Sequence, residues 1–272
     1  MATLATMSLG PPPARVPSHS IQLAVTNAGL SIGSKCILQE IDLEVRAGEV
    51  LCIIGPSGSG KTSLLRMMGG FIRASEGAVM AQGRQVVAPS RRFAFVFQDY
   101  GRALLPWRTV RGNVELALEA CETPRAERKA IAERLLYQVG LANVADAYPR
   151  QLSGGMQQRV QIARTLAQSP DMLLMDEPFG ALDAMTRETL QDELLKLAAA
   201  REMTVVFVTH DLEEAIYLGD RVVALSANPG RVAEVVDVDL PRPRDQLTTR
   251  EDSRFLALRH RLRGFLTEEG RR

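Results

Sequence analysis

One stretch, residues 49–66, constrains the fold and the chemistry of this chain more than any other. It reads EVLCIIGPSGSGKTSLLR, in which an apolar run at 50–54 leads into a glycine-rich turn and then into a helical run. This is the pattern G-x-x-x-x-G-K-[ST] in a strand–loop–helix context, where successive backbone N–H groups can point at phosphate oxygens. The start of the helix adds a partial positive charge, which favours an anion.

The residues of this loop predict a nucleotide site. The side chain of Lys61 is expected to reach the β- and γ-phosphates, and the hydroxyl of Thr62 is expected to hold Mg²⁺. A glycine-rich turn without a ligand is the alternative, and the motifs further along the chain indicate which kind of nucleotide-binding protein this is. The predicted nucleotide-binding residues are Gly55, Pro56, Ser57, Gly58, Ser59, Gly60, Lys61, Thr62 and Ser63.

The composition narrows the class of protein. The 272 residues allow one large domain or two small ones, and a net charge of +1 argues against a broad nucleic-acid-binding surface. No apolar run approaches the roughly 18 residues that a membrane-spanning helix needs. The three cysteines, Cys36, Cys52 and Cys121, lack the spacing of a metal site, and a reducing, cytosolic compartment fits them.

Strand and helix patterns alternate along the chain, which predicts an α/β fold with a mainly parallel sheet. Residues 1–20 contain a proline run and are expected to be a disordered lead-in. The block at about 100–164 lacks strand patterns and is expected to be a helical insertion. The expected strands are 21–25, 36–45, 50–54, 78–81, 93–97, 172–175, 204–209 and 222–225, the last of them closing the core, and the expected helices are 63–68, 110–119, 124–140, 186–200, 212–218 and one that opens near 151–156.

Two carboxylates, Asp176 and Glu177, follow the short apolar run at 172–175. In an open parallel sheet, ligands bind beyond the carboxyl ends of the strands, so this pair is expected beside the phosphate loop. Asp176 is predicted to hold Mg²⁺, which prefers hard oxygen ligands. Glu177 is predicted to be the general base for water that attacks the γ-phosphorus. A solvated pair of acidic residues at a strand end is the alternative.

A second glycine pair stands at a helix start in Leu152-Ser-Gly-Gly-Met156. Ser153 is a good N-cap, and Gly154 and Gly155 leave backbone N–H groups accessible to an anion. On these residues alone, a capped helix without a ligand is an equal alternative.

Taken together, the motifs resemble those of the ATP-binding-cassette (ABC) ATPases. The phosphate loop, a glutamine after FVF, LSGGMQQR, LLMDEP, Ala-Leu-Asp and Thr-His-Asp come in the order found in that family, over residues 21–227. The resemblance implies a P-loop NTPase with a RecA-like, mainly parallel sheet, an antiparallel β subdomain and a helical signature subdomain. It places an ATPase domain at 21–228 and a C-terminal tail at 229–272.

The resemblance also implies that two cassettes pair head to tail around two ATP molecules. Ser153, Gly154 and Gly155 of one chain would then contact the γ-phosphate held by the other. Gln98 would contact Mg²⁺ and the attacking water, and His210 would contact the γ-phosphate and hold Glu177. Asp183 would lie at the dimer interface. Without the resemblance, His210 is a strand-end histidine in the lead-in to a capped helix.

Two departures from the family pattern stand out. The family places an aromatic residue in the loop before the second strand, where it stacks on adenine, whereas here that region reads Gly29-Leu-Ser-Ile-Gly33. Leu30 or Ile32 is expected to supply an apolar contact instead. Met156 also stands where the commonest signature has glutamine, but the serine and the glycines that would meet the phosphate are retained.

The stretches at 98–107, 227–232 and 240–244 resemble the nitrate, sulfonate and taurine importer branch. The resemblance implies a homodimeric ATPase subunit at the cytoplasmic face of the membrane, which drives a separate permease fed by a solute-binding protein. Alternatives are an importer ATPase for another small solute such as a pyrimidine-type precursor, a soluble cassette ATPase that acts on DNA or ribosomes, and a small-molecule P-loop kinase.

Two further features carry open alternatives. Trp107 either lies near the groove that receives the permease or packs within the helical subdomain. At 253–266, apolar residues at helical spacing alternate with arginines. This pattern predicts an amphipathic helix, which either lies on a membrane or, as is commoner for a terminal helix, docks on its own core.

Overall fold

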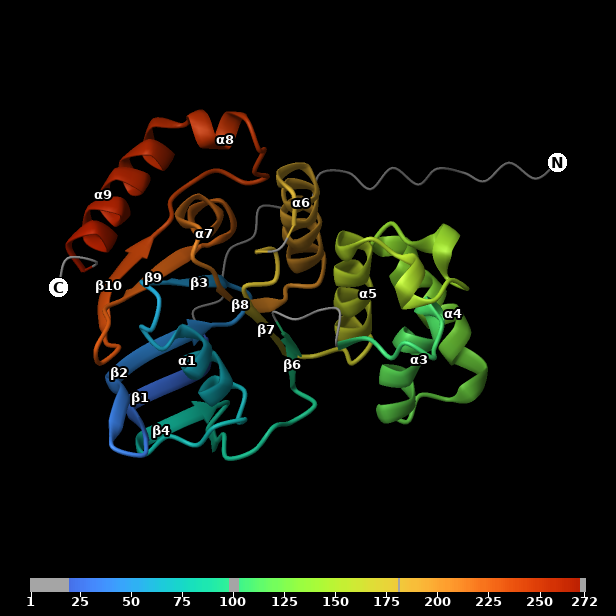
Figure 1. Cartoon of the computed structure of the whole chain (residues 1–272), viewed down its shortest axis with the longest axis horizontal. Coiled ribbons are helices and arrows are strands. Elements are labelled where there is room, and N and C mark those ends of the chain that lie inside the picture. The colour runs from blue at the N-terminus through green and yellow to red at the C-terminus, as the bar shows by residue number, and fades with distance from the viewer. Residues whose placement is uncertain (1–19, 98–102, 181, 270–272) are drawn as a thin grey trace.

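The computed structural model describes residues 20–97, 103–180 and 182–269, and these form two sheets flanked by helices (Figure 1). The first sheet is antiparallel, in the order β2-β1-β4-β5. Its strands are β1 (Ile21–Ile32), β2 (Lys35–Arg46), β4 (Glu76–Ala81) and β5 (Arg84–Gln85).

The second sheet has the order β10-β9-β3-β8-β7-β6 and is parallel except for β10, which pairs antiparallel with β9. The strands that lie beside β3 in this order come from the far end of the chain, as crossover connections through helices produce. The strands are β3 (Val50–Ile54), β6 (Phe93–Val96), β7 (Met172–Asp176), β8 (Thr204–Val208), β9 (Arg221–Leu225) and β10 (Val232–Asp237).

The helices fall into three groups (Figure 1). One, α1, packs between the sheets; α3, α4 and α5 form a separate helical subdomain; the others cover the far face of the parallel sheet. Their bounds are α1 (Lys61–Met68), α3 (Val110–Ala120), α4 (Arg125–Gln138), α5 (Gly154–Leu166), α6 (Ala184–Ala200), α7 (Leu212–Leu218), α8 (Thr248–Glu251) and α9 (Ser253–Glu269), with 3₁₀ turns at Ala142–Val144 and Pro149–Gln151. No helix among these residues is long and apolar enough to cross a membrane.

The central strand β3 is fully buried because it faces two cores at once. Leu51 and Ile53 point into the core shared with the antiparallel sheet and α1, whereas Val50, Cys52 and Ile54 point into the core under the other helices. Side chains alternate across a strand, so an uninterrupted apolar run is what a strand covered on both faces requires. The expected α/β class with an antiparallel β part and a helical part is confirmed.

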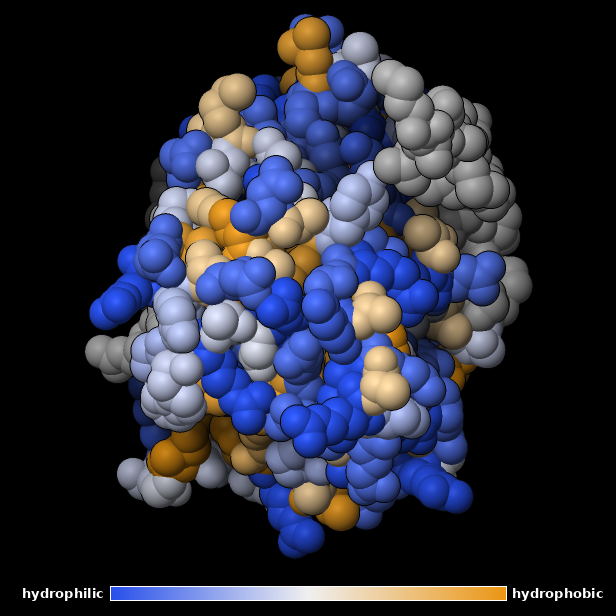
Figure 2. All heavy atoms as spheres, turned by 90° about the vertical axis from the view of Figure 1, so that its right-hand side faces the viewer, coloured by the Kyte–Doolittle hydropathy of each residue, from blue (hydrophilic) through white to orange (hydrophobic). Residues whose placement is uncertain are grey.

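The helical subdomain turns its apolar side chains inward. Val114, Leu118, Leu136 and Val160 are buried among α3, α4 and α5. Figure 2 shows the side of the molecule that carries this subdomain, and its surface is mainly hydrophilic, with apolar side chains in small separate groups. Trp107 is 71% exposed, so packing within the subdomain is not its role.

The structure corrects two expectations and narrows a third. The strand expected to close the core, at 222–225, is followed by β10 at the edge of the same sheet, so the expected boundary after residue 228 falls between two paired strands. The first strand runs on from Val25 to Ile32. Of the two residues expected to contact adenine, Leu30 or Ile32, Leu30 is buried in the core of the antiparallel sheet, which leaves Ile32.

The C-terminal helix docks on the protein itself. Phe255 and Leu262 of α9 are completely buried, and Leu258 and Phe265 pack against the same core. Of the two alternatives for this amphipathic helix, the structure therefore supports the docked terminal helix.

Candidate active site

The loop between β3 and α1 keeps its shape because glycines stand where no other residue fits. Gly60 has φ 84°, in the left-handed region, and a Cβ there would lie 2.6 Å from Leu38 Cδ2. A Cβ on Gly55 would lie 2.7 Å from the carbonyl oxygen of Leu225. The loop is therefore held tightly against β2 and β9, and its backbone curls as a phosphate loop must.

Lys61 is buried, and its ammonium turns back on the loop. Nζ donates to the carbonyl oxygens of Gly55, at 2.9 Å, and Pro56, at 3.0 Å. Burial lowers the pKa of Lys61, and the nearby carboxylates of Glu177 and Asp176 oppose that shift. These carbonyl contacts satisfy the cation, and an anion in the loop would offer it stronger partners.

The two predicted carboxylates lie at the carboxyl end of β7, beside the loop. Thr62 Oγ1 donates to Asp176 Oδ1 at 3.0 Å. Burial raises the pKa of Asp176, and the hydrogen bond from Thr62 partly offsets that rise. Glu177 has φ 44°, and its backbone N–H donates to the carbonyl of Val208. The side chain of Glu177 lines the cavity, whereas that of Asp176 does not.

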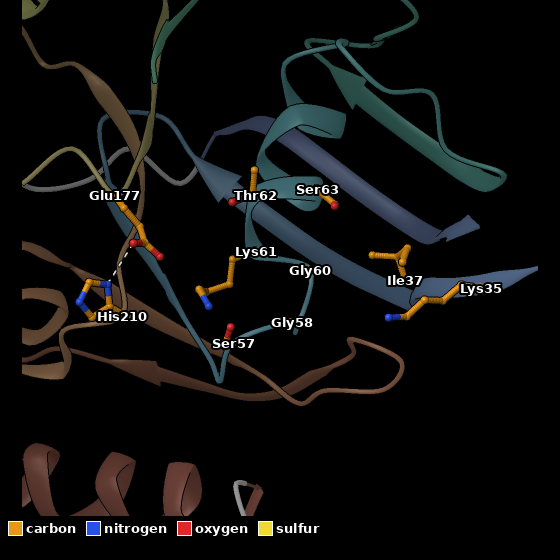
Figure 3. Close-up of a pocket in the computed structure, with 10 residues that line it drawn as sticks. All are labelled: Lys35, Ile37, Ser57, Gly58, Gly60, Lys61, Thr62, Ser63, Glu177 and His210. Carbon is orange, nitrogen blue, oxygen red and sulfur yellow. Dashed lines mark hydrogen bonds and ion pairs between the residues drawn. The ribbon is translucent and has the colours of Figure 1, made fainter. Parts of the chain in front are cut away.

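His210 completes the group from the next strand of the sheet. Its Nδ1 lies 3.1 Å from Glu177 Oε2. Figure 3 shows the two side chains pointing toward one another at one side of the cavity, with Lys61 beside them. Parallel strands bring these residues together because β3, β8 and β7 are neighbours and end at the same edge.

These side chains border a cavity of about 720 Å³ (Figure 3). Its volume is in the range of small-molecule sites. The residues that line it are Lys35, Ile37, Ser57, Gly58, Gly60, Lys61, Thr62, Ser63, Glu177 and His210.

Lys35 and Ile37 were not predicted as site residues. They alternate along β2 and share one face of it, so the strand pattern at 36–45 held the signal, but nothing local marks that face as the one beside the loop. Ile32, at the other side of the β1–β2 turn, is 59% exposed and pairs with Lys35.

The predicted signature residues lie elsewhere in the chain. Ser153 caps α5, and its Oγ accepts a hydrogen bond from the backbone N–H of Met156 at 3.3 Å. Gly155 is buried against α6, where a Cβ would lie 2.6 Å from Thr186 Cγ2. Among the described residues that line the cavity, none comes from this helix start, so the structure does not bring Ser153, Gly154 and Gly155 to the phosphate loop of their own chain.

Two predicted residues remain to be placed. Asp183 is the N-cap of α6, where its Oδ1 accepts a hydrogen bond from the backbone N–H of Thr186 at 3.0 Å, and this bond lowers its pKa. It lies beside the contact between α5 and α6. Gln98 lies outside the described residues.

The donor set fits magnesium rather than a metal held by protein alone. The described residues contain no group of three or more His, Cys, Asp or Glu side chains that could hold a metal ion. The hydroxyl of Thr62 and the carboxylate of Asp176 are hard oxygen donors at one spot, which suits an ion that takes its remaining ligands from phosphates and water.

The fold and the site together define a P-loop ATPase, with a phosphate loop, a carboxylate pair at the end of a neighbouring strand and a separate helical subdomain. The family model described as ABC transporter matches residues 38–180, just over half of the chain. The chain belongs to this family, and it is an ATP-binding and ATP-hydrolysing protein.

The chain is similar to several named relatives. An uncharacterized ABC transporter ATP-binding protein of Methanocaldococcus jannaschii is 51% identical over 85% of each chain. The nitrate import ATP-binding protein NrtC of Synechococcus elongatus is 44% identical over 88% of this chain and 36% of that protein. The bicarbonate transport ATP-binding protein CmpC of the same species is 44% identical over 86% of this chain and 35% of that protein. The chain therefore spans about a third of the last two relatives.

A solved structure gives the same fold. It is a dimeric, post-hydrolysis state of an ATP-binding cassette bound to ADP and Pi, with a TM-score of 0.69 and 34% identity. The match covers 79% of this chain and 98% of that one.

Proposed function

We propose that this chain is the ATP-hydrolysing subunit of an importer and energises uptake of a small anion, such as nitrate, an aliphatic sulfonate or taurine, through a separate permease. The observation that carries the proposal is the assembly of Lys61, Thr62, Glu177 and His210 around one cavity, with Asp176 hydrogen-bonded to Thr62 beside it. The similarity to proteins named for nitrate and bicarbonate supports the choice of a small anion.

The side chains of this assembly have separate roles in the proposal. Lys61 and the backbone N–H groups of the loop hold the triphosphate of ATP. Thr62 and Asp176, together with Gln98, hold Mg²⁺, which would neutralise charge on the phosphates. Glu177 takes the proton of the attacking water, and His210 keeps that carboxylate oriented.

A second copy of the chain completes the site. Ser153, Gly154 and Gly155 lie outside the cavity of their own chain, and the start of α5 is accessible at Ser153. We assign these residues to the γ-phosphate held by the partner, and Asp183 to the interface between the copies. The dimeric cassette with ADP and Pi, at 34% identity, supports this arrangement.

The permease docks, in this proposal, in a groove of about 500 Å³ between the parallel sheet and α3. Three of its apolar side chains are aromatic rings in mutual contact: Phe71 meets Phe95 and Phe97 edge-on, with centroids 5.3 Å and 6.0 Å apart. Phe71 and Phe97 are both more than one-third exposed. Exposed aromatic side chains in a groove with arginines at its rim, Arg91 and Arg164, suit a short amphipathic helix of a membrane protein.

The site of action follows from this partner. The subunit would sit on the cytoplasmic face of the cell membrane, bound to its permease, and a solute-binding protein would deliver the anion from the other side. The anion itself would not touch this chain.

The test is the substitution Glu177→Gln, which keeps the shape of the side chain and removes the base. We expect kcat for ATP hydrolysis to fall by roughly 10²- to 10⁴-fold, while ATP binding is retained. In cells, uptake of labelled nitrate, taurine or sulfonate should stop. The matched control is Glu251→Gln, an exposed carboxylate on α8 that should leave both measurements unchanged.

The same experiment separates the parts of the proposal. Hydrolysis by the Glu177→Gln protein at the parental rate would remove Glu177 from the role of base. Loss of hydrolysis with normal uptake of all three anions would leave the ATPase intact as a conclusion and exclude these anions as cargo.

A further inference from the structure

The position of His210 depends on the short helix that follows it. His210 directly precedes Asp211, the N-cap of α7, whose Oδ1 accepts hydrogen bonds from the backbone N–H groups of Glu213 and Glu214. The helix has seven residues, too few to be stable without tertiary contacts. Whatever holds α7 therefore also sets where His210 lies relative to Glu177.

One side of α7 is held by α6 and by Thr209, the residue that follows β8. The buried carboxylate of Glu214 accepts hydrogen bonds from Gln191 of α6 and from the hydroxyl of Thr209. Arg187 Nη1 donates to Asp211 Oδ2 at 3.4 Å. These contacts join α7 to the helix that begins at Asp183.

The other side of α7 is held by the C-terminal segment, residues 242–269. Two arginines of this segment form ion pairs with the first turn of the helix. Arg250 Nη1 donates to Glu213 Oε2 at 3.0 Å, and Arg259 Nη1 donates to Glu213 Oε1 at 3.1 Å. Both carboxylate oxygens of Glu213 are thus used. The guanidinium of Arg250 also lies over the ring of Tyr217, 5.2 Å from its centroid.

The last turn of α7 is held by the same segment. The buried guanidinium of Arg244 donates to the carbonyl oxygens of Ile216 and Tyr217, which the end of the helix leaves without intrahelical partners. Arg242 donates to Leu218 O and to the carboxylate of Asp220, which itself accepts from the backbone N–H of Val50 at the start of β3. The segment thus holds both ends of α7, and through Arg242 and Asp220 it connects the last turn to the strand that carries the phosphate loop.

We propose that Arg250 and Arg259 are positioning residues for ATP hydrolysis: by holding Glu213 they fix the first turn of α7 and thereby keep His210 against Glu177. This inference rests on the proposed roles of His210 and Glu177. It gives the C-terminal segment, which follows the residues matched by the family model, a part in the chemistry of the site.

Geometry favours an effect on turnover over an effect on folding. The side chains of Glu213, Arg250 and Arg259 are all partly exposed, and ion pairs of that kind contribute little to the free energy of unfolding. The segment stays attached without them because Phe255 and Leu262 are buried. ATP binding should also persist, since neither arginine lines the cavity.

The experiment compares steady-state hydrolysis by the full chain and by the double variant Arg250→Ala/Arg259→Ala. We expect kcat to fall roughly 10- to 100-fold, because a displacement of about 1 Å in a reacting group can have an effect of that size, while KM for ATP changes less than about twofold. The double variant Arg250→Lys/Arg259→Lys keeps both positive charges and should recover most of the lost kcat. The control is Arg254→Ala, whose guanidinium bonds Asp252 within the same segment and should leave kcat unchanged.

The results decide the proposal in both directions. A parental kcat for the double alanine variant would overturn it, and so would a loss of ATP binding that matches the loss of kcat, because the segment would then support the whole site. Thermal unfolding of each variant checks that the fold is retained. If Glu177→Gln hydrolyses ATP as fast as the parental protein, the proposed role of Glu177 as base fails, and this outcome is distinct from a failure of the arginine variants to lower kcat.

Discussion

The two glycine-bearing helix starts of this chain, at α1 and at α5, are built in opposite ways. The start of α1 has Gly60 as its N-cap, no side-chain cap, and a buried cation, Lys61, turned onto the loop. The start of α5 is capped by the hydroxyl of Ser153 and lies in the helical subdomain, away from the cavity.

This difference indicates which partners the backbone N–H groups of each helix start need. The N–H groups at the start of α1 have no side-chain partner, so an anion is the natural partner for them and for Lys61. The start of α5 is satisfied in part by its own serine and is stable without a ligand. In our proposal, the start of α1 therefore binds ATP in its own chain, and the start of α5 acts on the ATP that the partner holds.

We expect the largest effect from a substitution of Lys61 at the start of α1. We expect Lys61→Ala to lower the affinity for ATP by at least about 100-fold, because hydrogen bonds from a charged group contribute roughly 1.5–3 kcal/mol each. Equilibrium binding of a fluorescent ATP analogue measures it. The control is Lys35→Ala at the rim of the same cavity, where the side chain is exposed and the loss should be much smaller. Unchanged binding by the Lys61→Ala protein would contradict the phosphate-loop assignment.

A mixing experiment tests whether the two starts act on the same ATP from different chains. Lys61→Ala removes one start, and Ser153→Asp places a carboxylate against the γ-phosphate at the other, so each variant alone should hydrolyse almost no ATP. When the two variants are mixed in equal amounts and their subunits exchange freely, half of the dimers contain one chain of each kind. Each of these dimers has one intact site of two, so about a quarter of the parental rate should return. If both starts served the same chain, mixing would restore nothing.

The features that a short local pattern specifies could be predicted from the sequence. The fold class and the family were predicted correctly because the spacing of 55–62 and the order of the motifs fix a strand–loop–helix unit and its neighbours. The approach of His210 to Glu177 was expected only through the resemblance, since 33 residues separate them and only the parallel pairing of β7 with β8 brings them together.

Long-range packing explains what the sequence did not predict. β10 is an edge strand with mostly exposed or half-exposed residues, and its pattern follows a proline and a glycine that read as a loop. The β1–β2 pairing shifts register on both sides of Leu30, so simple alternation could not tell that Leu30 faces the core and Ile37 the cavity. The arginines that hold α7 lie 24 to 46 residues further along the chain than their partners in the helix, and no local sequence pattern pairs residues at that separation.

Disturbing the contact between Gly155 of α5 and Thr186 of α6 should have a smaller effect, on stability. Gly155→Ala would place a methyl group 2.6 Å from Thr186 Cγ2, and overpacking of this kind costs about 1–3 kcal/mol in the free energy of unfolding. Chemical denaturation measures it. Thr186→Ser removes the opposing methyl group, so the double variant should recover most of the loss.

The control for this contact is Gly264→Ala in α9, where a Cβ would meet nothing within 4 Å. That variant should be as stable as the parental protein or slightly more so, since alanine favours a helix. An equal loss of stability in Gly155→Ala and Gly264→Ala would mean that the close packing of α5 on α6 does not cause the effect.

We expect the smallest effect from variants of Ser153, which separate its role as the N-cap of α5 from its proposed role in catalysis. Ser153→Ala removes the acceptor for the Met156 N–H and should lower the free energy of unfolding by about 1 kcal/mol, whereas Ser153→Asp keeps a capping oxygen and should change it by only a few tenths. ATP hydrolysis should follow the reverse order, with the aspartate variant the less active because its charge repels phosphate. A comparable pair of substitutions is not available at the start of α1, because its N-cap, Gly60, has no side chain to replace. If activity instead followed stability across the two Ser153 variants, Ser153 would be a helix cap and nothing more.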